Sequence, residues 1–333
     1  MNPNRSRLLQ DLEKARDSRV LIYVTGDRRE LETKISSDVF DFFVHHLDAI
    51  GDRPKISLFL YTRGGDTLAA WSIANLICQF CDDLEVIVPA KAHSAGTLIS
   101  LAANRIVMTK QATLGPIDPS VNTPLNPGIQ GAPPNMKAPV SVEDVNGFIE
   151  FVRSVSEDSD HVREAFLRLT DAVNPLVLGN AFRARSQIRM LARKLMADKY
   201  AKSDLVEGIL GFLCSESGSH DYTINRREAK DKLGLPIEKP DDALYDIIKG
   251  LYNDIAAQLE LARPFDPNTM LGADSSVNYR FSRALIESVP GGSHVFISEG
   301  RLLRQQLQTP QGPQMAIQDE RMFDGWRYED ARE

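Results

Sequence analysis

Two short segments of the chain place residue types that suit nucleophilic catalysis directly after predicted strands. Ser94 stands between a predicted strand and a predicted helix, and Ala95 and Gly96 follow it. A serine in such a turn exposes its hydroxyl at the start of the helix, and the next backbone N–H can face a developing oxyanion. The G-x-S-x-G pattern of many hydrolases is absent, because Ala92 and His93 precede the serine. Taken by itself, a serine before a helix is more often an N-cap than a nucleophile.

The second segment is the pair Gly64-Gly65, which also lies between a predicted strand and a predicted helix. Glycines let the backbone approach a ligand closely and leave amide N–H groups exposed at a helix start. The pair matches neither a dinucleotide-binding loop nor a P-loop, and alone it is equally well explained as a tight turn. The 29 residues that separate Gly65 from Ser94 amount to one helix and one strand. Two neighbouring parallel strands would therefore bring both turns together, which favours a catalytic site.

The elements that must position these turns alternate between strand and helix. Short apolar runs predict buried strands at 20–24, 56–61, 84–88 and 106–108. Apolar residues at helical spacing predict helices at 1–18, 39–50, 66–80 and 97–103. This alternation predicts an α/β fold with mostly parallel strands.

The remainder of the chain has a different pattern. Residues 116–140 hold seven prolines and predict a long surface loop, which in compact domains is often functional. Helical patterns follow at 142–200, 203–214 and 241–261, and from 264 onward only short β-like runs and a turn at 290–292 are evident. We therefore expect one domain over residues 1–262 and an appended segment over 263–333, which contacts a neighbouring subunit or covers the active site.

Composition excludes several classes of protein. The 333 residues are 42% hydrophobic and 26% charged with a formal net charge of −7, so nucleic-acid binding driven by bulk charge is not expected. Three cysteines make no disulfide framework and fit a reducing compartment, and Cys78 and Cys81 have no second pair with which to hold zinc. No apolar run has the length of a membrane span. We expect a cytoplasmic protein without a metal or cofactor.

Three segments resemble one family of proteins. The runs LYTRGGD at 60–66, HSAGTLISLAA at 93–103 and ATLGPIDP at 112–119 are similar to the serine dehydrogenase proteinase family. That family belongs to the Clp-protease/crotonase superfamily and is related to signal peptide peptidase A. Further similar runs, SHDYTI at 219–224 and LGLP at 233–236, extend the resemblance over about residues 15–262. It implies a spiral of βαβ units with an additional helical region.

The resemblance also implies a serine endopeptidase that cleaves peptides or unfolded proteins. Its nucleophile would be Ser94, and the oxyanion hole would use the backbone N–H of Gly64 or Gly65 together with that of Ala95. It further implies a homo-oligomer, in which ring-like or stacked subunits enclose the active sites.

The base that activates the serine has two candidates. Lys137 lies 43 residues past Ser94 in a loop, and related signal peptide peptidases use a Ser–Lys dyad with lysine in a comparable loop. His220 with Asp221 falls where Clp proteases place their triad aspartate, and histidine titrates near neutrality. The position of the Clp histidine holds none here, so Lys137 is preferred and His220 stays open. Lys91 lies three residues before Ser94 and ranks below both candidates, because the side chains of neighbouring residues on a tight turn usually point apart.

Two other functions compete with the peptidase. A crotonase-like acyl-CoA enzyme would use the same backbone N–H groups to stabilise a thioester enolate, and stabilisation by CoA would favour it. A catalytically inactive assembly module of the same fold would account for an absent base. A nucleophilic serine at position 94 argues against the acyl-CoA enzyme, whereas the unassigned base keeps the inactive module as an alternative.

Overall fold

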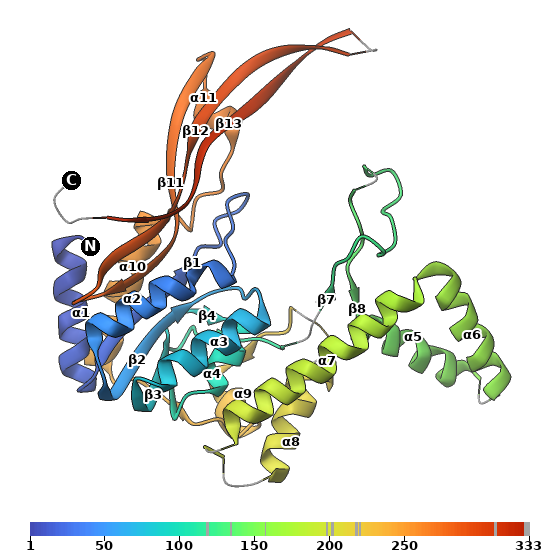
Figure 1. The fold of residues 1–333 in the computed structure, drawn as a ribbon, viewed down its shortest axis with the longest axis horizontal. Coiled ribbons are helices and arrows are strands. Elements are labelled where there is room, and N and C mark those ends of the chain that lie inside the picture. The colour runs from blue at the N-terminus through green and yellow to red at the C-terminus, as the bar shows by residue number, and fades with distance from the viewer. Residues whose placement is uncertain are drawn as a thin grey trace. The chain divides into compact units, whose positions relative to one another are not determined.

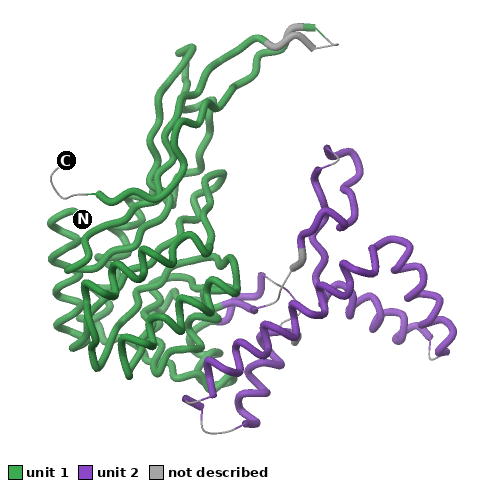
Figure 2. Tube along the Cα trace, viewed as in Figure 1, with its two compact units in different colours: residues 1–114, 225–333 green, residues 115–224 purple. Residues whose placement is uncertain are grey.

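A computed structural model of the chain describes residues 1–117, 120–133, 135–156, 158–197, 199–200, 203–216, 219, 221–309 and 312–329. It divides into two compact units, one formed by residues 1–114 with 225–333 and one by residues 115–224 (Figure 2). The boundary predicted between residues 262 and 263 lies inside the first unit and stays a prediction.

The first unit is organised on an eight-stranded mixed sheet with the order β10-β5-β3-β2-β1-β11-β12-β13 (Figure 1). Its first five strands pair in parallel, which confirms the predicted α/β fold. These strands are β1 (Arg19–Thr25), β2 (Arg53–Tyr61), β3 (Cys81–Val88), β5 (Arg105–Met108) and β10 (Ile237–Glu238).

Helices cover both faces of the parallel half. Leu9 and Leu12 of α1 pack with Ile248 of α10 against alternate strand residues such as Ile22 and Phe59. The intervening residues face the opposite layer, where Tyr23 of β1 meets the ring of α2 residue Phe43 edge-on at 5.1 Å between centroids. Burial on both faces explains why these strands are continuous apolar runs rather than alternating ones. The helices are α1 (Pro3–Arg16), η1 (Ser37–Val39), α2 (Phe40–Ile50), α3 (Thr67–Cys78), α4 (Ala95–Leu101), α9 (Arg226–Asp231), α10 (Asp242–Gln258) and α11 (Pro267–Leu271).

The C-terminal residues complete the same sheet with three antiparallel strands. These are β11 (Ser276–Ser288), β12 (Gly292–Thr309) and β13 (Gly312–Tyr328), and β11 pairs antiparallel with β1. The turn predicted at 290–292 is present between β11 and β12, but the strands are far longer than the short runs expected. Figure 1 shows β12 and β13 continuing beyond the rest of the sheet as a curved ribbon. Because much of β13 is exposed on both faces, it lacks the apolar alternation that reveals a strand.

The second unit is largely helical. Residues such as Val177, Ile188 and Leu191 of α7 are buried, and Arg189 and Arg193 form ion pairs with Glu207 of α8. These ion pairs bridge two helices of one unit. The elements are β7 (Ser120–Val121), β8 (Val140–Ser141), α5 (Val142–Val155), α6 (Ser159–Ala172), α7 (Pro175–Met196), α8 (Ser203–Gly211) and a π-helical turn (Phe212–Glu216).

A buried histidine pair ties α2 to the turn between β11 and β12. Nδ1 of His46 lies 2.8 Å from Oγ of Ser288, and its Nε2 lies 3.1 Å from Nδ1 of His294. Burial, reinforced by the neighbouring His294 and His45, lowers the pKa of His46 to about 3. Burial likewise lowers the pKa of His294 to about 4. Both rings are therefore neutral in the folded protein at neutral pH.

We expect this pair to make stability fall as the solution becomes acidic. A histidine in the unfolded chain has a pKa near 6.5. Between pH 6.5 and 5, His46 and His294 therefore bind protons in the unfolded chain but stay neutral in the folded chain. His46 alone should then lower the free energy of unfolding by about 2 kcal/mol at pH 5 relative to pH 7. Urea unfolding at both pH values measures this difference, which His46→Gln should reduce. His161→Gln, at an exposed position on α6, is the control and should leave the difference unchanged; an equal difference in wild type and His46→Gln would contradict the prediction.

Candidate active site

The two turns singled out in the sequence lie side by side in the first unit. Thr62, directly after β2, is bridged in parallel to Ala92 of β4 (Lys91–Ala92). The N–H of Thr62 donates to the carbonyl of Lys91, and the N–H of His93 donates to the carbonyl of Thr62, both at 3.1 Å. These bonds hold the glycine turn and the serine turn in register. The separation of one helix and one strand along the chain thus becomes direct contact in space.

Gly64 lies against the side chain of Ser94. A Cβ atom on Gly64 would be 2.7 Å from Cβ and 3.2 Å from Oγ of Ser94, and the φ angle of Gly64 is +113°. Both the space and the backbone conformation therefore require glycine. A substrate carbonyl placed beside Ser94 would meet the backbone of this turn rather than a side chain.

The conformation of Ser94 differs from that of an ordinary helix cap. Its φ is 52° and its ψ is −114°, in a region that residues other than glycine seldom adopt. Among the described residues, no N-cap hydrogen bond links its hydroxyl to α4. Ser94 is partly exposed. The N-cap explanation therefore fails, and a serine with a strained backbone in a strand-to-helix turn is the arrangement expected of a nucleophile.

The backbone donors around Ser94 fall into two groups. The N–H of Gly64 already donates to Oγ1 of Thr62 at 2.9 Å. Within the described part of the chain, no acceptor is recorded for the N–H groups of Gly65 and Ala95. Ala95 opens α4, and the first N–H groups of a helix have no partner inside it. Of the three candidate oxyanion donors, Gly65 and Ala95 are therefore the two with a free N–H.

Two residues that the sequence analysis did not single out hold the glycine turn in place. Thr62 is fully buried, and its Oγ1 lies 2.6 Å from Oγ1 of Thr25, at the end of β1. Its methyl group occupies the space beside Gly96, where a Cβ atom would approach it to 2.4 Å. A threonine after each of two neighbouring strands was the only signal in the sequence, and it is too common to predict a role.

The basic residues next to Ser94 are engaged elsewhere. Nζ of Lys91 lies 2.8 Å from the carboxylate of Asp27, and the hydroxyl of Tyr61 donates to the same carboxylate at 2.6 Å. Burial opposes ionisation of Asp27, but the bonds from Lys91 and Tyr61 outweigh burial and lower the pKa of Asp27. Nε2 of His93 lies 2.8 Å from Oγ1 of Thr113 on β6 (Thr113–Leu114). These contacts agree with the low rank of Lys91 as a base and engage the His93 ring as well.

The candidate bases Lys137 and His220, with Asp221, belong to the second unit. Lys137 is half-buried in the loop before β8, where its backbone bridges that of Gly128. Asp221 is exposed, and its N–H donates to Oγ of Ser219 at 3.2 Å. His220 lies outside the described residues. Because Ser94 is in the first unit, the identity of the base stays a prediction.

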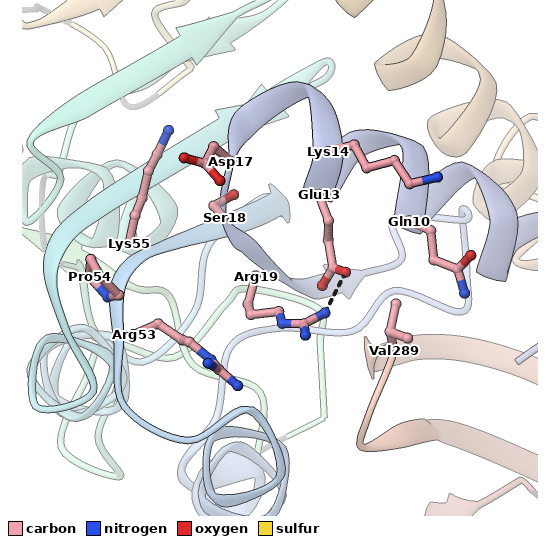
Figure 3. A pocket seen from close by; sticks show the side chains of 10 residues that line it. All are labelled: Gln10, Glu13, Lys14, Asp17, Ser18, Arg19, Arg53, Pro54, Lys55 and Val289. Carbon is pink, nitrogen blue, oxygen red and sulfur yellow. Dashed lines mark hydrogen bonds and ion pairs between the residues drawn. The ribbon is translucent and has the colours of Figure 1, made fainter.

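A cavity of about 590 Å³ lies at the opposite end of the parallel strands from Ser94, where β1 and β2 begin (Figure 3). Two of the cations that line it pair with carboxylates of the protein: Arg19 pairs with Glu13 at 2.9 Å, and Lys55 pairs with Glu85 at 3.3 Å. The Ser94 turn lies instead beyond the carboxyl end of β2. The cavity is therefore separate from the candidate site.

The described residues contain no group of three or more His, Cys, Asp or Glu side chains placed to hold a metal ion. The described helices include none that is both long and apolar enough to cross a membrane.

A serine turn that faces a glycine turn at the ends of parallel strands is the distinguishing feature of this α/β protein. A model of the ClpP-like SDH-type serine proteinases matches residues 1–149. An uncharacterized protein of Methanocaldococcus jannaschii is 31% identical over 242 residues, which cover 70% of this chain and 73% of the relative. A second uncharacterized protein of that organism is 26% identical over 244 residues, covering 70% and 71%. The chain belongs to the SDH-type ClpP-like serine proteinase family, as the sequence resemblance predicts.

Solved structures that resemble the chain include proteases. A mutant of ClpP1 from Listeria monocytogenes is 14% identical, with a TM-score of 0.37, and the match covers 70% of this chain and 98% of that one. A mutant of the membrane-bound stomatin-specific protease 1510-N is 23% identical, with a TM-score of 0.26, and the match covers 44% and 69%.

Proposed function

We propose that the protein is a serine endopeptidase that hydrolyses peptides or unfolded proteins through an acyl-enzyme on Ser94. The observation that carries the proposal is the contact between Gly64 and a strained Ser94 whose hydroxyl caps no helix. The family is a serine proteinase family, which supports peptide substrates. Cytoplasmic location and homo-oligomeric assembly stay predictions from the sequence.

The proposed reaction involves the groups around Ser94 one after another. A base takes the proton of Oγ while Oγ attacks the scissile carbonyl carbon, and the carbonyl oxygen becomes an oxyanion. The N–H groups of Gly65 and Ala95 stabilise that oxyanion, and one such donor typically contributes about 3 kcal/mol to the transition state. The C–N bond then breaks, the amine leaves with the proton, and water hydrolyses the ester in the same way.

Hydrolysis of a reduced, denatured protein tests the proposed function. The wild-type protein should release peptides with new amino termini at many positions, detected by mass spectrometry, without added cofactor. A preparation that releases none but is stabilised against heat by CoA would favour the acyl-CoA enzyme. A preparation that shows neither property would favour the inactive assembly module.

We expect Lys137→Ala to lower the rate of Ser94 acylation by about 10²-fold or more, as for loss of a general base. His220→Ala should leave most of the rate. Acylation should rise with pH, because a base accepts the serine proton only when neutral, and a histidine limb lies nearer neutrality than a lysine limb. The acylation rates of both variants between pH 6 and 10 measure this. The reverse pattern would transfer the role to His220 with Asp221, and no loss in either variant would make Lys91 the next residue to test.

A further inference from the structure

The turn that holds Gly64 and Gly65 is hydrogen-bonded to the loop that follows β1. Residues 26–36 connect β1 to η1, and Ile35 of this loop is bridged to Gly65. The N–H of Ile35 donates to the carbonyl of Gly64 at 2.9 Å, and the N–H of Asp66 donates to the carbonyl of Ile35 at 2.8 Å. The peptide groups on either side of Gly65 are thus fixed by one residue. A shift of Ile35 would reorient the N–H of Gly65.

The C-terminal strands hold this loop in two ways: Leu31 packs with apolar residues of β11 and β12, and Arg283 bonds to the backbone of the loop. Arg283 on β11 donates from Nε to the carbonyl of Leu31 at 2.9 Å and from Nη2 to the carbonyl of Glu32 at 2.7 Å. The carbonyl of Arg283 accepts the N–H of Gly26 at 2.8 Å and the hydroxyl of Thr33 at 3.1 Å. Arg283 therefore contacts both ends of the turn that leads to Ile35.

The side chain of Arg283 is itself fixed by the next two strands. Its Nη1 lies 3.0 Å from Oγ of Ser298 on β12 and 3.3 Å from the carboxylate of Asp324 on β13. The pairing of β11 with β12 shifts register between Ser282 and Ala284, so Arg283 sits at a bulge. A bulge re-aims a side chain that regular pairing would direct elsewhere. All of these residues belong to the first unit.

We propose that Arg283 is a positioning residue for the oxyanion hole, acting through the loop of residues 26–36 and through Ile35 on the N–H of Gly65. This inference rests on the proposed function. The proposal gives β11, β12 and β13 a role in catalysis within the same chain. Arg283 lies on β11, residues of β12 and β13 bond to its guanidinium, and the guanidinium bonds to the loop. Arg283 touches neither substrate nor Ser94 and affects the reaction only through the placement of backbone groups.

The test compares Arg283→Gln with Arg280→Gln, which lies on the same strand and pairs with Glu299 and Glu329 instead of the loop. For each purified full-length variant, the acylation rate at saturating fluorophosphonate and the concentration for half-maximal rate are measured. Arg283→Gln should lower the saturating rate by about 10-fold or more, because a small misplacement of a catalytic group is costly. The half-saturating concentration and the pH dependence should not change. Arg280→Gln should react like wild type, and Arg283→Lys, which keeps one charged donor, should fall between.

Two further measurements separate positioning from loss of fold. Unfolded molecules lower the amplitude of labelling but not the rate of the molecules that react. Hydrogen exchange should become faster in Arg283→Gln at residues 26–36 and at the Gly64–Asp66 turn, with the parallel strands unchanged. Should Arg283→Gln not fold, Thr33→Val removes the hydroxyl bonds to the carbonyls of Arg283 and Gly26 and should give a smaller loss of the same kind.

The possible results distinguish this inference from the proposed function. A wild-type protein that does not react, or a Ser94→Ala variant that reacts equally, overturns the proposed function and the inference with it. A reactive wild type whose saturating rate is retained in Arg283→Gln overturns the inference alone, whether or not exchange in the loop increases. An equal loss in Arg280→Gln also overturns it, because the effect would then belong to the strand as a whole.

Discussion

Replacing Ser94 with alanine is expected to abolish hydrolysis of an unfolded protein while leaving the fold intact. The proposed acyl-enzyme forms on Oγ of this residue, and loss of a nucleophilic serine typically lowers turnover by about 10³-fold or more. The stability should change little, because among the described residues Oγ makes no cap hydrogen bond with α4. Steady-state hydrolysis and thermal unfolding of the same preparation measure both effects.

Ser36 provides a matched control for this substitution. It also precedes a helix without a side-chain cap bond in the described structure, but it is exposed and begins η1 rather than α4. Although Ser36 belongs to the loop of residues 26–36, that loop acts on Gly65 through the backbone of Ile35, so Ser36→Ala should keep full activity. Retention of hydrolysis in Ser94→Ala would show that another residue carries the reaction.

Gly64→Ala should also inactivate the protein, although it adds only one methyl group. The new Cβ would lie 2.7 Å from Cβ and 3.2 Å from Oγ of Ser94, so the serine must move. Displacing a reacting atom by about 1 Å can cost about 10²-fold in rate. The measurement is the rate of fluorophosphonate acylation, corrected for the fraction of folded protein.

Gly51→Ala separates this contact from backbone strain. Gly51 has a φ of +69° and a ψ of 176° but no heavy atom within 4 Å of an added Cβ, so its replacement should cost on the order of 1–3 kcal/mol of stability and no activity. Equal activity in Gly64→Ala and Gly51→Ala would mean that the contact with Ser94 does not matter.

Gly65 has a different reason to be glycine from the one its sequence suggests. The sequence alone suggests that a bulkier residue at position 65 would crowd the substrate carbonyl. In the structure, a Cβ atom on Gly65 would lie 2.2 Å from the carbonyl oxygen of Ile35. Substitution of Gly65 would therefore displace the supporting loop first, which makes Gly64 the better position for testing the site.

The parallel half of the fold and the pairing of the two turns could be predicted from the sequence because their signals are local. Each buried strand is a short apolar run, and the turns follow strands that are neighbours along the chain. Because one helix and one strand separate the two turns along the chain, pairing of the neighbouring parallel strands is enough to bring Gly64 and Ser94 together.

The support of the site could not be predicted in the same way. Ile35 acts on Gly64 and Asp66 through its backbone N–H and carbonyl, and no side-chain pattern encodes such a contact. Arg283 reaches loop carbonyls from a strand some 250 residues later in the chain, at a bulge that sequence does not reveal. The base could not be identified for another reason: Lys137 lies within the proline-rich loop of residues 116–140 and His220 lies after it, and no hydrophobic periodicity predicts the path of that loop.

Mapping of a fluorophosphonate adduct tests the central claim most directly. The native wild-type protein would be treated with the probe, its intact mass measured, and the modified residue located by tandem mass spectrometry. The account predicts one adduct per chain, located on Ser94, absent from Ser94→Ala and lost when the protein is unfolded before treatment. An adduct on another residue, or a folded wild-type protein that takes up none, would contradict it.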